Sequence, residues 1–429
     1  MAAQLHMPPA AEIALHEINV ADPALFQNDA HWNYFKRLRD EAPVHFCAES
    51  QYGPYWSVTR YADIVGVDSD HKRFSSASGI TLGNLTGGRD PAEDSEEQRR
   101  RRDQYGGFSM FIAMDPPKHD LQRATVTRIV APPSLSKLEG TIRERAGRIL
   151  DSLPVGETFN WVDRVSIELT TQMLATLFDF PFEDRRKLTR WSDVATSPLG
   201  ALVETREERR AELMACLEYF TALWNERVRQ PPKNDLISML AHGESTRNMV
   251  PFEFLGNLLL LIVGGNDTTR NSISGGVLAL NQNPGEYDKL RANPGLIASM
   301  VPEIIRWQTP LSHMARVATE DVEIQGQQIR AGDRVVMWYV SGNRDERAIR
   351  DPGAFIIDRA RPRQHLSFGF GIHRCMGNRL AEMQLRVLWE EILARFDFVE
   401  VVGAPERTFS TLIKGYTELP VRLHPKNTS

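Results

Sequence analysis

The chain has 429 residues, of which 41% are hydrophobic and 25% are charged, and its net charge is −5. This composition is ordinary for a globular protein with a large buried core, and the negative balance argues against nucleic acid as the main partner. Three cysteines, Cys47, Cys216 and Cys375, are too few for a disulfide framework and fit a reducing cytoplasm. The segment 1–20 has no signal-like apolar core, and the most apolar run, 258–263, is too short to span a bilayer.

Helical patterns dominate the chain, and strand-like patterns occur mainly in its C-terminal half. Apolar periodicity predicts helices at residues 32–41, 142–153, 161–178, 206–228, 252–281, 286–293, 294–307 and 377–396. Alternation and turn residues predict strands within 44–58 and at 322–324, 328–329 and 334–338. The polar stretch 88–107 places four arginines beside glutamates, so we interpret it as a solvated loop rather than a basic docking patch.

Two basic residues follow the prolines at 116–117. The prolines predict the start of a helix, and His119 and Arg123 stand four residues apart, so they share one helix face. Two such donors on one face suit a buried carboxylate. Taken singly, each is more commonly an ordinary surface or core side chain.

The predicted helix over 252–281 contains two adjacent glycines, Gly264 and Gly265, followed by Asp267 and Thr268. Each glycine destabilises a helix by about 1 kcal/mol relative to alanine. The Thr268 hydroxyl can donate to the carbonyl of Gly264, which loosens the helix there. The pattern predicts space for a diatomic ligand and water, with Asp267 as a proton source beside the Thr268 hydroxyl. The alternative is a purely structural kink.

Glu303 and Arg306 stand three residues apart on a helical pattern, so they share one face and can form an ion pair. Alone, such a pair is usually a surface ion pair that contributes little to stability. Its interpretation therefore depends on the rest of the chain.

A glycine-rich turn with one cysteine precedes the last long predicted helix. Residues 368–381 read Phe-Gly-Phe-Gly-Ile-His-Arg-Cys-Met-Gly-Asn-Arg-Leu-Ala. Gly369 and Gly371 permit a backbone that approaches a flat ligand closely. The sulfur of Cys375 would face the positive end of the helix that begins near Gly377, which favours the thiolate form.

A thiolate at this position can bind a metal. The nearest partners of Cys375 are His365 and His373 only, so no zinc cluster is completed. A lone cysteine in such a turn is usually structural. The metal-ligand interpretation therefore depends on the glycines, His373 and the following helix occurring together.

Residues 368–381 resemble the haem-binding signature of the cytochrome P-450 family, and every defining position of that signature is filled. Further matching motifs extend from Asp115 to Ala381. The resemblance implies a cytochrome P-450 fold, mainly α-helical with small β-sheets. We accordingly expect one large haem domain over 21–429, with a minor β-rich region, after a flexible segment 1–20.

The resemblance also implies roles for individual residues. Cys375 is the axial ligand of the iron of haem b, and its thiolate promotes O–O cleavage. Asp267 and Thr268 form an acid–alcohol pair that delivers protons to dioxygen. Glu303, Arg306 and Arg359 form a structural cluster outside the chemistry. The haem propionates are held by His119, Arg123, Arg316 and His373. The full set expected to surround the cofactor is His119, Arg123, Gly264, Gly265, Arg316, Phe368, Gly369, His373, Cys375 and Gly377.

The implied activity is that of a monooxygenase that uses O2 as co-substrate. The chain has no room for a flavin or nicotinamide domain, so electrons from NAD(P)H must arrive through redox partners. The family's soluble bacterial members use a 2Fe-2S ferredoxin and a flavin ferredoxin reductase, and Arg128, Arg374 and Arg379 could form part of the docking surface. The expected substrate pocket is apolar and suits an apolar substrate; its residues are Leu261, Ile262, Val263, Leu311 and Met314.

Residues 264–271, 311–316 and 337–345 resemble the alkane-hydroxylase branch of the family. This predicts terminal hydroxylation of medium-chain alkanes or fatty acids. One alternative is a monooxygenase of a terpene, steroid or macrolide. Another, from a different class, is a non-catalytic haem-based sensor, although the intact pair of Asp267 and Thr268 argues against it.

Overall fold

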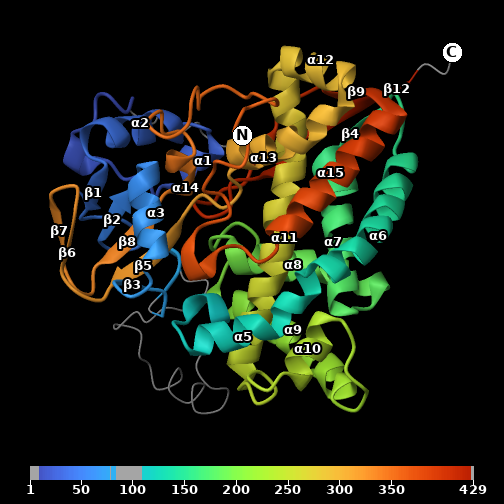
Figure 1. Ribbon diagram of the computed structural model, residues 1–429, viewed down its shortest axis with the longest axis horizontal. Helices are drawn as coiled ribbons and strands as arrows, with labels where there is room; N and C mark the ends of the chain where they lie inside the picture. Colours follow the sequence, from blue (N-terminus) through green and yellow to red (C-terminus); the bar gives the residue numbers. More distant parts are fainter. Residues whose placement is uncertain (1–8, 78, 84–108, 427–429) are drawn as a thin grey trace. The chain divides into compact units, whose positions relative to one another are not determined.

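The computed structural model describes residues 9–77, 79–83 and 109–426. The described chain is mainly helical with small sheets, as predicted, and it forms two compact units built from alternating stretches of sequence (Figure 1). The first unit takes Met1–Gly83, Ser274–Cys375 and Glu400–Val421, and the second takes Asn84–Ile273, Met376–Val399 and Arg422–Ser429. Among the described residues, no helix combines the length and apolar character that crossing a bilayer requires.

The first unit contains a five-stranded sheet in the order β1-β2-β8-β5-β3 (Figure 1). Only the central pair β2 and β8 is parallel; the other neighbours are antiparallel. The strands are β1 (Val44–Cys47), β2 (Tyr55–Val58), β3 (Phe74–Ser75), β5 (Met314–Ala318) and β8 (Arg334–Met337). Two hairpins complete this unit: β6 (Val322–Ile324) with β7 (Gln327–Ile329), and β10 (Glu406–Arg407) with β11 (Tyr416–Glu418).

The first unit contains several helices and a core of buried aromatic side chains. The indole ring of Trp338 lies 5.1 Å from the ring of Phe35 and 6.2 Å from that of Phe26, measured between centroids, and all three side chains are buried. Such aromatic contacts add to the free energy of burial. The helices are α1 (Pro23–Gln27), α2 (His31–Glu41), α3 (Tyr61–Ser69), α12 (Pro284–Ala292), α13 (Ile297–Gln308) and α14 (Tyr339–Gly342), with short helical turns at Leu15–Glu17, Pro294–Leu296 and Gly371–His373.

The second unit is built mostly from long helices. They are α5 (Lys118–Thr127), α6 (Pro132–Asp151), α7 (Glu168–Phe178), α8 (Arg186–Thr196), α9 (Arg206–Arg227), α10 (Leu236–His242), α15 (Asn378–Arg395) and most of α11 (Pro251–Gln282), with short turns at Phe111–Ala113, Arg128–Val130, Val162–Ile167 and Phe182–Asp184. A three-stranded sheet has the order β4 (Thr158–Asn160), β12 (Pro420–Pro425) and β9 (Phe396–Val401). The neighbouring helices α6 and α15 are joined by Arg143, which contacts Glu390 at 2.5 Å and Glu391 at 2.8 Å.

Most predicted elements occur close to their expected positions, notably α2, α9, α11 and α15. The helix predicted over 142–153 begins much earlier, at Pro132, because two prolines at its start are compatible with a first helical turn. The helix predicted over 161–178 begins with a wider π-type turn at Val162–Ile167.

Several helices and strands of the structure were not predicted from the sequence, among them α3, α8, β5 and β12. The loop predicted at 88–107 lies outside the described residues. In the N-terminal segment 1–20, the described part includes Ile18 and Val20, which are buried, and the domain boundary at residue 20 stays a prediction.

Candidate active site

The cysteine loop lies in the first unit and places Cys375 at an exposed position. Its backbone N–H donates to the carbonyl of Phe368 at 2.8 Å, and the N–H of Gly369 donates to Leu366 at 2.8 Å. Gly369 and Gly371 both have φ of +64°, a region that side chains disfavour. The loop is therefore a tightly folded turn that presents the cysteine at its end.

The buried carboxylate of Asp68 holds this loop in place. One Asp68 oxygen accepts hydrogen bonds from the Phe370 N–H and the Tyr339 hydroxyl, each at 2.8 Å, and the other pairs with Arg316 at 2.8 Å. A Cβ atom on Gly371 would lie 2.5 Å from the Asp68 carbonyl oxygen, so only glycine fits. Burial, assisted by the nearby Asp68 charge, raises the pKa of Tyr339, which keeps its hydroxyl proton available for donation.

Two of the four predicted propionate ligands lie in this same unit. Arg316 is buried on β5 and is held by Asp68, and the Nε2 atom of buried His373 lies 2.9 Å from the Ser76 hydroxyl. The other two, His119 and Arg123, lie on α5 in the second unit, where Nδ1 of buried His119 is 2.7 Å from the Asp120 carboxylate. A site made from all four residues stays a prediction.

The middle of α11 has one open face, formed by Leu260, Leu261, Gly264 and Thr268. These residues recur at helical spacing, none of them is buried, and a Cβ atom on Gly264 would meet no other atom within 4 Å. The Thr268 hydroxyl donates to the carbonyl of Gly264 at 3.0 Å, as predicted. The face therefore consists of apolar side chains, a gap at the glycine, and one hydroxyl.

The second glycine of the pair has a different role. A Cβ atom on Gly265 would lie 2.7 Å from Cδ2 of Leu174, so the glycine allows α7 and α11 to approach closely. Ile262, expected in the substrate pocket, is fully buried and is not part of the open face. Leu261 and Val263 are partly exposed. In the first unit, Leu311 is partly exposed and Met314 is buried.

Asp267 is completely buried and is surrounded by donors from α8 and α11. Ser192 donates to its carboxylate at 3.0 Å, Thr196 at 3.4 Å, and the Asn266 amide at 3.1 Å. Within the described residues, Asp267 and Thr268 form no hydrogen bond with each other. A proton passing between them therefore requires a side-chain rotation or a bridging water.

The charge of Asp267 is only partly balanced. Arg270 lies 3.2 Å from the Asp267 carboxylate but 2.5 Å from that of Asp193, so one cation serves two anions. Burial raises the pKa of Asp267 to about 6, and the Asp193 charge adds to this, whereas Arg270 opposes it. Asp267 can therefore gain and lose a proton near neutral pH.

The predicted structural cluster is present in the first unit. Glu303 contacts Arg306 at 2.7 Å and Arg359 at 3.0 Å, and both Glu303 and Arg306 are completely buried. Arg306 also donates to three backbone carbonyls, those of Asn343, Pro352 and Ala354. The pair is thus a fully hydrogen-bonded internal anchor and not a surface ion pair.

Known proteins resemble this chain over almost its entire length. A family model for cytochrome P-450 matches residues 295–418. Linalool 8-monooxygenase of Pseudomonas putida is 34% identical over 409 residues, which cover 95% of this chain and 99% of the relative. Methyl-branched lipid omega-hydroxylase of Mycobacterium tuberculosis is 31% identical and covers 96% of each chain.

The chain belongs to the cytochrome P-450 family.

Solved cytochrome P-450 structures share its fold. The cytochrome P-450-153 of Novosphingobium aromaticivorans has a TM-score of 0.86 and 44% identity, over 95% of this chain and 99% of that one. A structure from Sphingomonas sp. PAMC 26605 also has a TM-score of 0.86, with 46% identity over 94% and 98% of the two chains. The family uses haem b, O2 and electrons that come from NAD(P)H through redox partners, and the chain is a monooxygenase of this family.

The residues of the cysteine loop fit a haem iron. Among the described residues, no three His, Cys, Asp or Glu side chains are grouped so that they could hold a metal ion. A single exposed cysteine instead suits a metal whose other ligands come from a macrocycle. The tight glycine turn packs against Asp68 and so fixes the loop that presents this cysteine. Cys375 is therefore the residue of this chain that would hold the cofactor.

Several residues around these sites have no signal in the sequence patterns. Asp68 lies on α3 and Ser192 on α8, and neither helix is predicted from periodicity. Each contacts a predicted site residue that is distant in sequence, Arg316 in one case and Asp267 in the other.

Proposed function

We propose that this cytochrome P-450 hydroxylates the terminal carbon of medium-chain alkanes or fatty acids. The observation that carries the proposal is the open face of α11, where Leu260 and Leu261 precede Gly264 and Thr268. This face offers only apolar contacts next to the residues that handle oxygen, which suits an unfunctionalised chain. The similarity to a lipid omega-hydroxylase over 96% of the chain supports the same assignment.

Each residue then has a limited task. Haem, which Cys375 would hold, would supply the activation of dioxygen and the insertion of one oxygen atom. Arg316, held by Asp68, offers a cation to a propionate of the cofactor. The apolar face of α11 positions the chain end, which matters because a terminal C–H bond is harder to break than an internal one.

Proton supply falls to the acid and the alcohol of α11. The buried carboxyl of Asp267, with a pKa of about 6, takes up a proton at its Oδ atoms and releases it at neutral pH. The Thr268 hydroxyl lies on the open face beside Gly264, where it would meet the reactants. Ser192 and Thr196 hold the Asp267 carboxylate in place between these events.

Terpene oxidation is the second candidate, because linalool 8-monooxygenase is 34% identical over almost the whole chain. A terpene alcohol differs from an alkane by its branching and its hydroxyl group. Both candidates require an apolar pocket, so they are separated by turnover and not by the character of the pocket.

A 2Fe-2S ferredoxin with a flavin reductase is the proposed source of electrons. Arg128 and Arg379 in the second unit and Arg374 in the first are each exposed, so each is accessible to an acidic ferredoxin. Substitution of each arginine by glutamine should lower the rate of reduction by the ferredoxin without changing substrate binding. Stopped-flow reduction at two ionic strengths measures this.

Turnover with a surrogate ferredoxin system tests the substrate assignment. Octane, dodecanoic acid and linalool are compared by the spin-state change on binding and by mass spectrometry of the products. We expect terminal alcohols from the first two. Efficient turnover of linalool alone would support the terpene alternative, and haem binding without any product would support a sensor.

Cys375→Ala tests the assigned iron ligand, and Cys216→Ala is its matched control. Loss of the thiolate should abolish the red-shifted Soret band of the reduced carbon monoxide complex and reduce turnover to background. Cys216→Ala, at a buried cysteine whose pKa is raised above its usual range by burial, should keep both properties. A Cys375→Ala protein that retained the red-shifted band would contradict the assigned ligand.

A further inference from the structure

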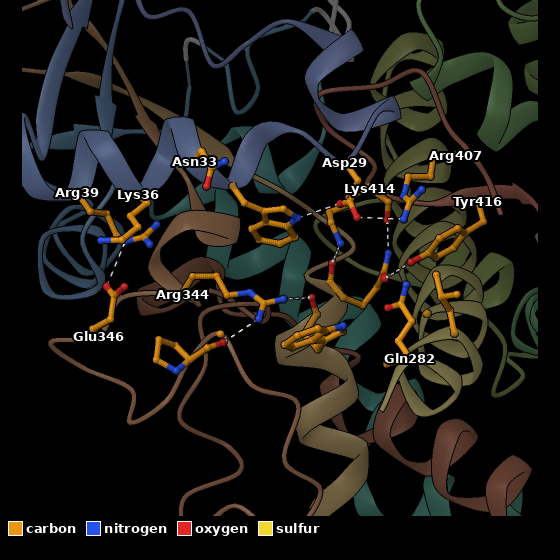
Figure 2. A pocket seen from close by; sticks show the side chains of 18 residues that line it. Asp29, Asn33, Lys36, Arg39, Gln282, Arg344, Glu346, Arg407, Lys414 and Tyr416 are labelled. Atoms are coloured by element: carbon orange, nitrogen blue, oxygen red, sulfur yellow. Dashed lines mark hydrogen bonds and ion pairs between the residues drawn. The ribbon is translucent and has the colours of Figure 1, made fainter. Parts of the chain in front are cut away.

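A cavity with a volume of about 360 Å³ lies within the first unit (Figure 2). Side chains from α2, the end of α11, the end of α13 and the β10–β11 hairpin line it. None of the residues assigned to haem, dioxygen or proton transfer is among them. Asn33 and Lys36 are exposed at its wall, so the cavity is open to solvent.

Three buried cations line this cavity, Arg39, Arg344 and Lys414, and the last two lie beside the ring of Trp32. Lys414 is 9% exposed; its Nζ donates to the carbonyl of Gln308 at 2.9 Å and lies 5.3 Å from the centre of the Trp32 ring. The guanidinium of Arg344, also 9% exposed, lies 4.6 Å from the same Trp32 ring and 3.7 Å from that of Trp307. Lys414 and Arg344 thus share one aromatic neighbour, and Figure 2 shows both on the wall of the cavity.

Neither Lys414 nor Arg344 has a carboxylate within ion-pair distance among the residues that the structure describes. The two acidic residues of the lining are engaged elsewhere: Asp29 with Arg407 at 3.0 Å, and Glu346 with Arg39 at 3.9 Å. The hydrogen bonds of Arg344 go to carbonyl oxygens, those of Pro352 at 2.8 Å and Trp307 at 3.4 Å. The cavity therefore carries an excess of positive charge.

The excess positive charge of the cavity lowers the stability of the protein when no ligand is bound. Burial lowers the pKa of Lys414 to about 8, and the charges of Arg344 and Arg407 contribute in the same direction, with Asp29 opposing them. A buried cation without an anion destabilises the fold unless other groups compensate, and aromatic faces and carbonyl oxygens compensate only in part. The described hydrogen bond of Lys414 uses one of its three N–H donors, so two are available to a ligand.

We propose that this cavity binds a small organic carboxylate. The carboxylate would contact Lys414 and Arg344, and the apolar or aromatic body would lie against Trp32 and against Leu278 of α11. The indole rings and the leucine favour an organic anion over an inorganic one, because a bare phosphate leaves this apolar surface without a contact. The site is separate from the catalytic residues and does not depend on the proposed substrate.

The first test titrates the haem-loaded enzyme with benzoate by calorimetry while the Soret band is recorded. We expect benzoate to bind without a Soret change, and benzamide and inorganic phosphate to bind at least tenfold more weakly. Lys414→Met should weaken benzoate by about tenfold or more, since a charged hydrogen bond is lost. Lys414→Arg should restore binding, and Lys72→Met, at an exposed lysine of the same unit, should leave it unchanged.

Benzoate affinity equal in Lys414→Met and the wild type would overturn the proposal, as would phosphate binding more tightly than benzoate. A Soret shift over the same benzoate concentrations that release the heat of binding would also overturn it, because benzoate would then be bound beside the haem. A second measurement does not need a variant. Crystals of the wild-type holoenzyme soaked in 4-bromobenzoate should show anomalous bromine density beside Trp32, and density only elsewhere would contradict the site.

Discussion

Two buried aspartates, one in each unit, have different surroundings, which suit the first to an anchoring role and the second to the proton transfer proposed above. Asp68 is 2% exposed and has three donors at 2.8 Å, one of which is the guanidinium of Arg316. Asp267 is fully buried, yet its donors stand at 3.0 to 3.4 Å and its cation is closer to another carboxylate.

The difference lies in how completely the negative charge is balanced. Short, dedicated hydrogen bonds hold Asp68 in one arrangement and, through it, the backbone of the cysteine loop. Long or shared bonds leave Asp267 with a pKa raised to about 6, so both of its protonation states are accessible at neutral pH. Removal of the first aspartate should therefore damage the fold, and removal of the second should damage turnover.

The largest effect is expected for Asp68→Ala. It leaves the buried Arg316 cation without an anion and the Tyr339 hydroxyl without an acceptor. The free energy of unfolding should fall by about 3–5 kcal/mol, and haem should dissociate faster. Urea denaturation and haem transfer to apomyoglobin measure the two losses.

Asp321→Ala is the matched control in the same unit, since its ion pair with Arg330 is exposed on both sides. It should change stability by less than about 1 kcal/mol. Equal effects of Asp68→Ala and Asp321→Ala would show that Asp68 is not an anchor.

Asp267→Asn should reduce turnover and leave stability almost unchanged. It keeps the size and the hydrogen-bonding oxygen of the side chain but cannot release a proton, so kcat should fall by about 100-fold or more with little loss of stability. Product formation at saturating substrate and ferredoxin measures kcat. Asp163→Asn, at an exposed carboxylate of the same unit, should retain full turnover, and a large stability loss in Asp267→Asn with normal kcat would reverse the assigned roles.

The pH dependence of stability should also differ between the wild-type protein and Asp267→Asn. The folded-state pKa of Asp267, about 6, lies above its ordinary value of 3.8. Between these values the folded state binds more protons than the unfolded state, so the contribution of this group to stability falls as pH rises and is constant above about pH 7. The difference in unfolding free energy between wild type and Asp267→Asn should therefore decrease from about pH 4 to pH 7, and a flat difference would contradict the raised pKa.

The smallest effects are expected at the neighbours of Asp267, and they should have opposite signs. Ser192→Ala removes a donor to the carboxylate and should raise the pKa of Asp267, whereas Asp193→Asn removes a nearby negative charge and should lower it. Each change should shift the acidic limb of the pH–kcat profile by up to about one unit. Shifts in the same direction would mean that Asp267 does not set that limb.

Local and periodic features were predictable from the sequence. The cysteine loop, the Gly264–Thr268 segment of α11 and the cluster of Glu303, Arg306 and Arg359 each follow a short motif, and the structure has each motif in the expected element. The apolar period of α11 likewise predicted its bounds to within one residue at each end.

The supporting residues were not predictable, for reasons of distance and environment. Asp68 is 248 positions from Arg316, and Ser192 is 75 positions from Asp267, so no local pattern joins them. The helix α3 that carries Asp68 is a short apolar segment without a clear amphipathic period. The helix α8 does have apolar residues at helical spacing, Leu188, Trp191 and Val194, but this period does not indicate that Ser192 contacts Asp267. Such partners emerge only when the packing of helices is known.

The unequal surroundings of the glycines have a consequence for engineering. At Gly371 an added methyl group would overlap the Asp68 backbone, and the left-handed φ excludes it a second time. At Gly264 the same methyl group meets nothing and simply narrows the open side of α11. A mutant library should therefore leave position 371 untouched, whereas a side chain at position 264 would preserve the scaffold but fill the space expected for dioxygen beside Thr268.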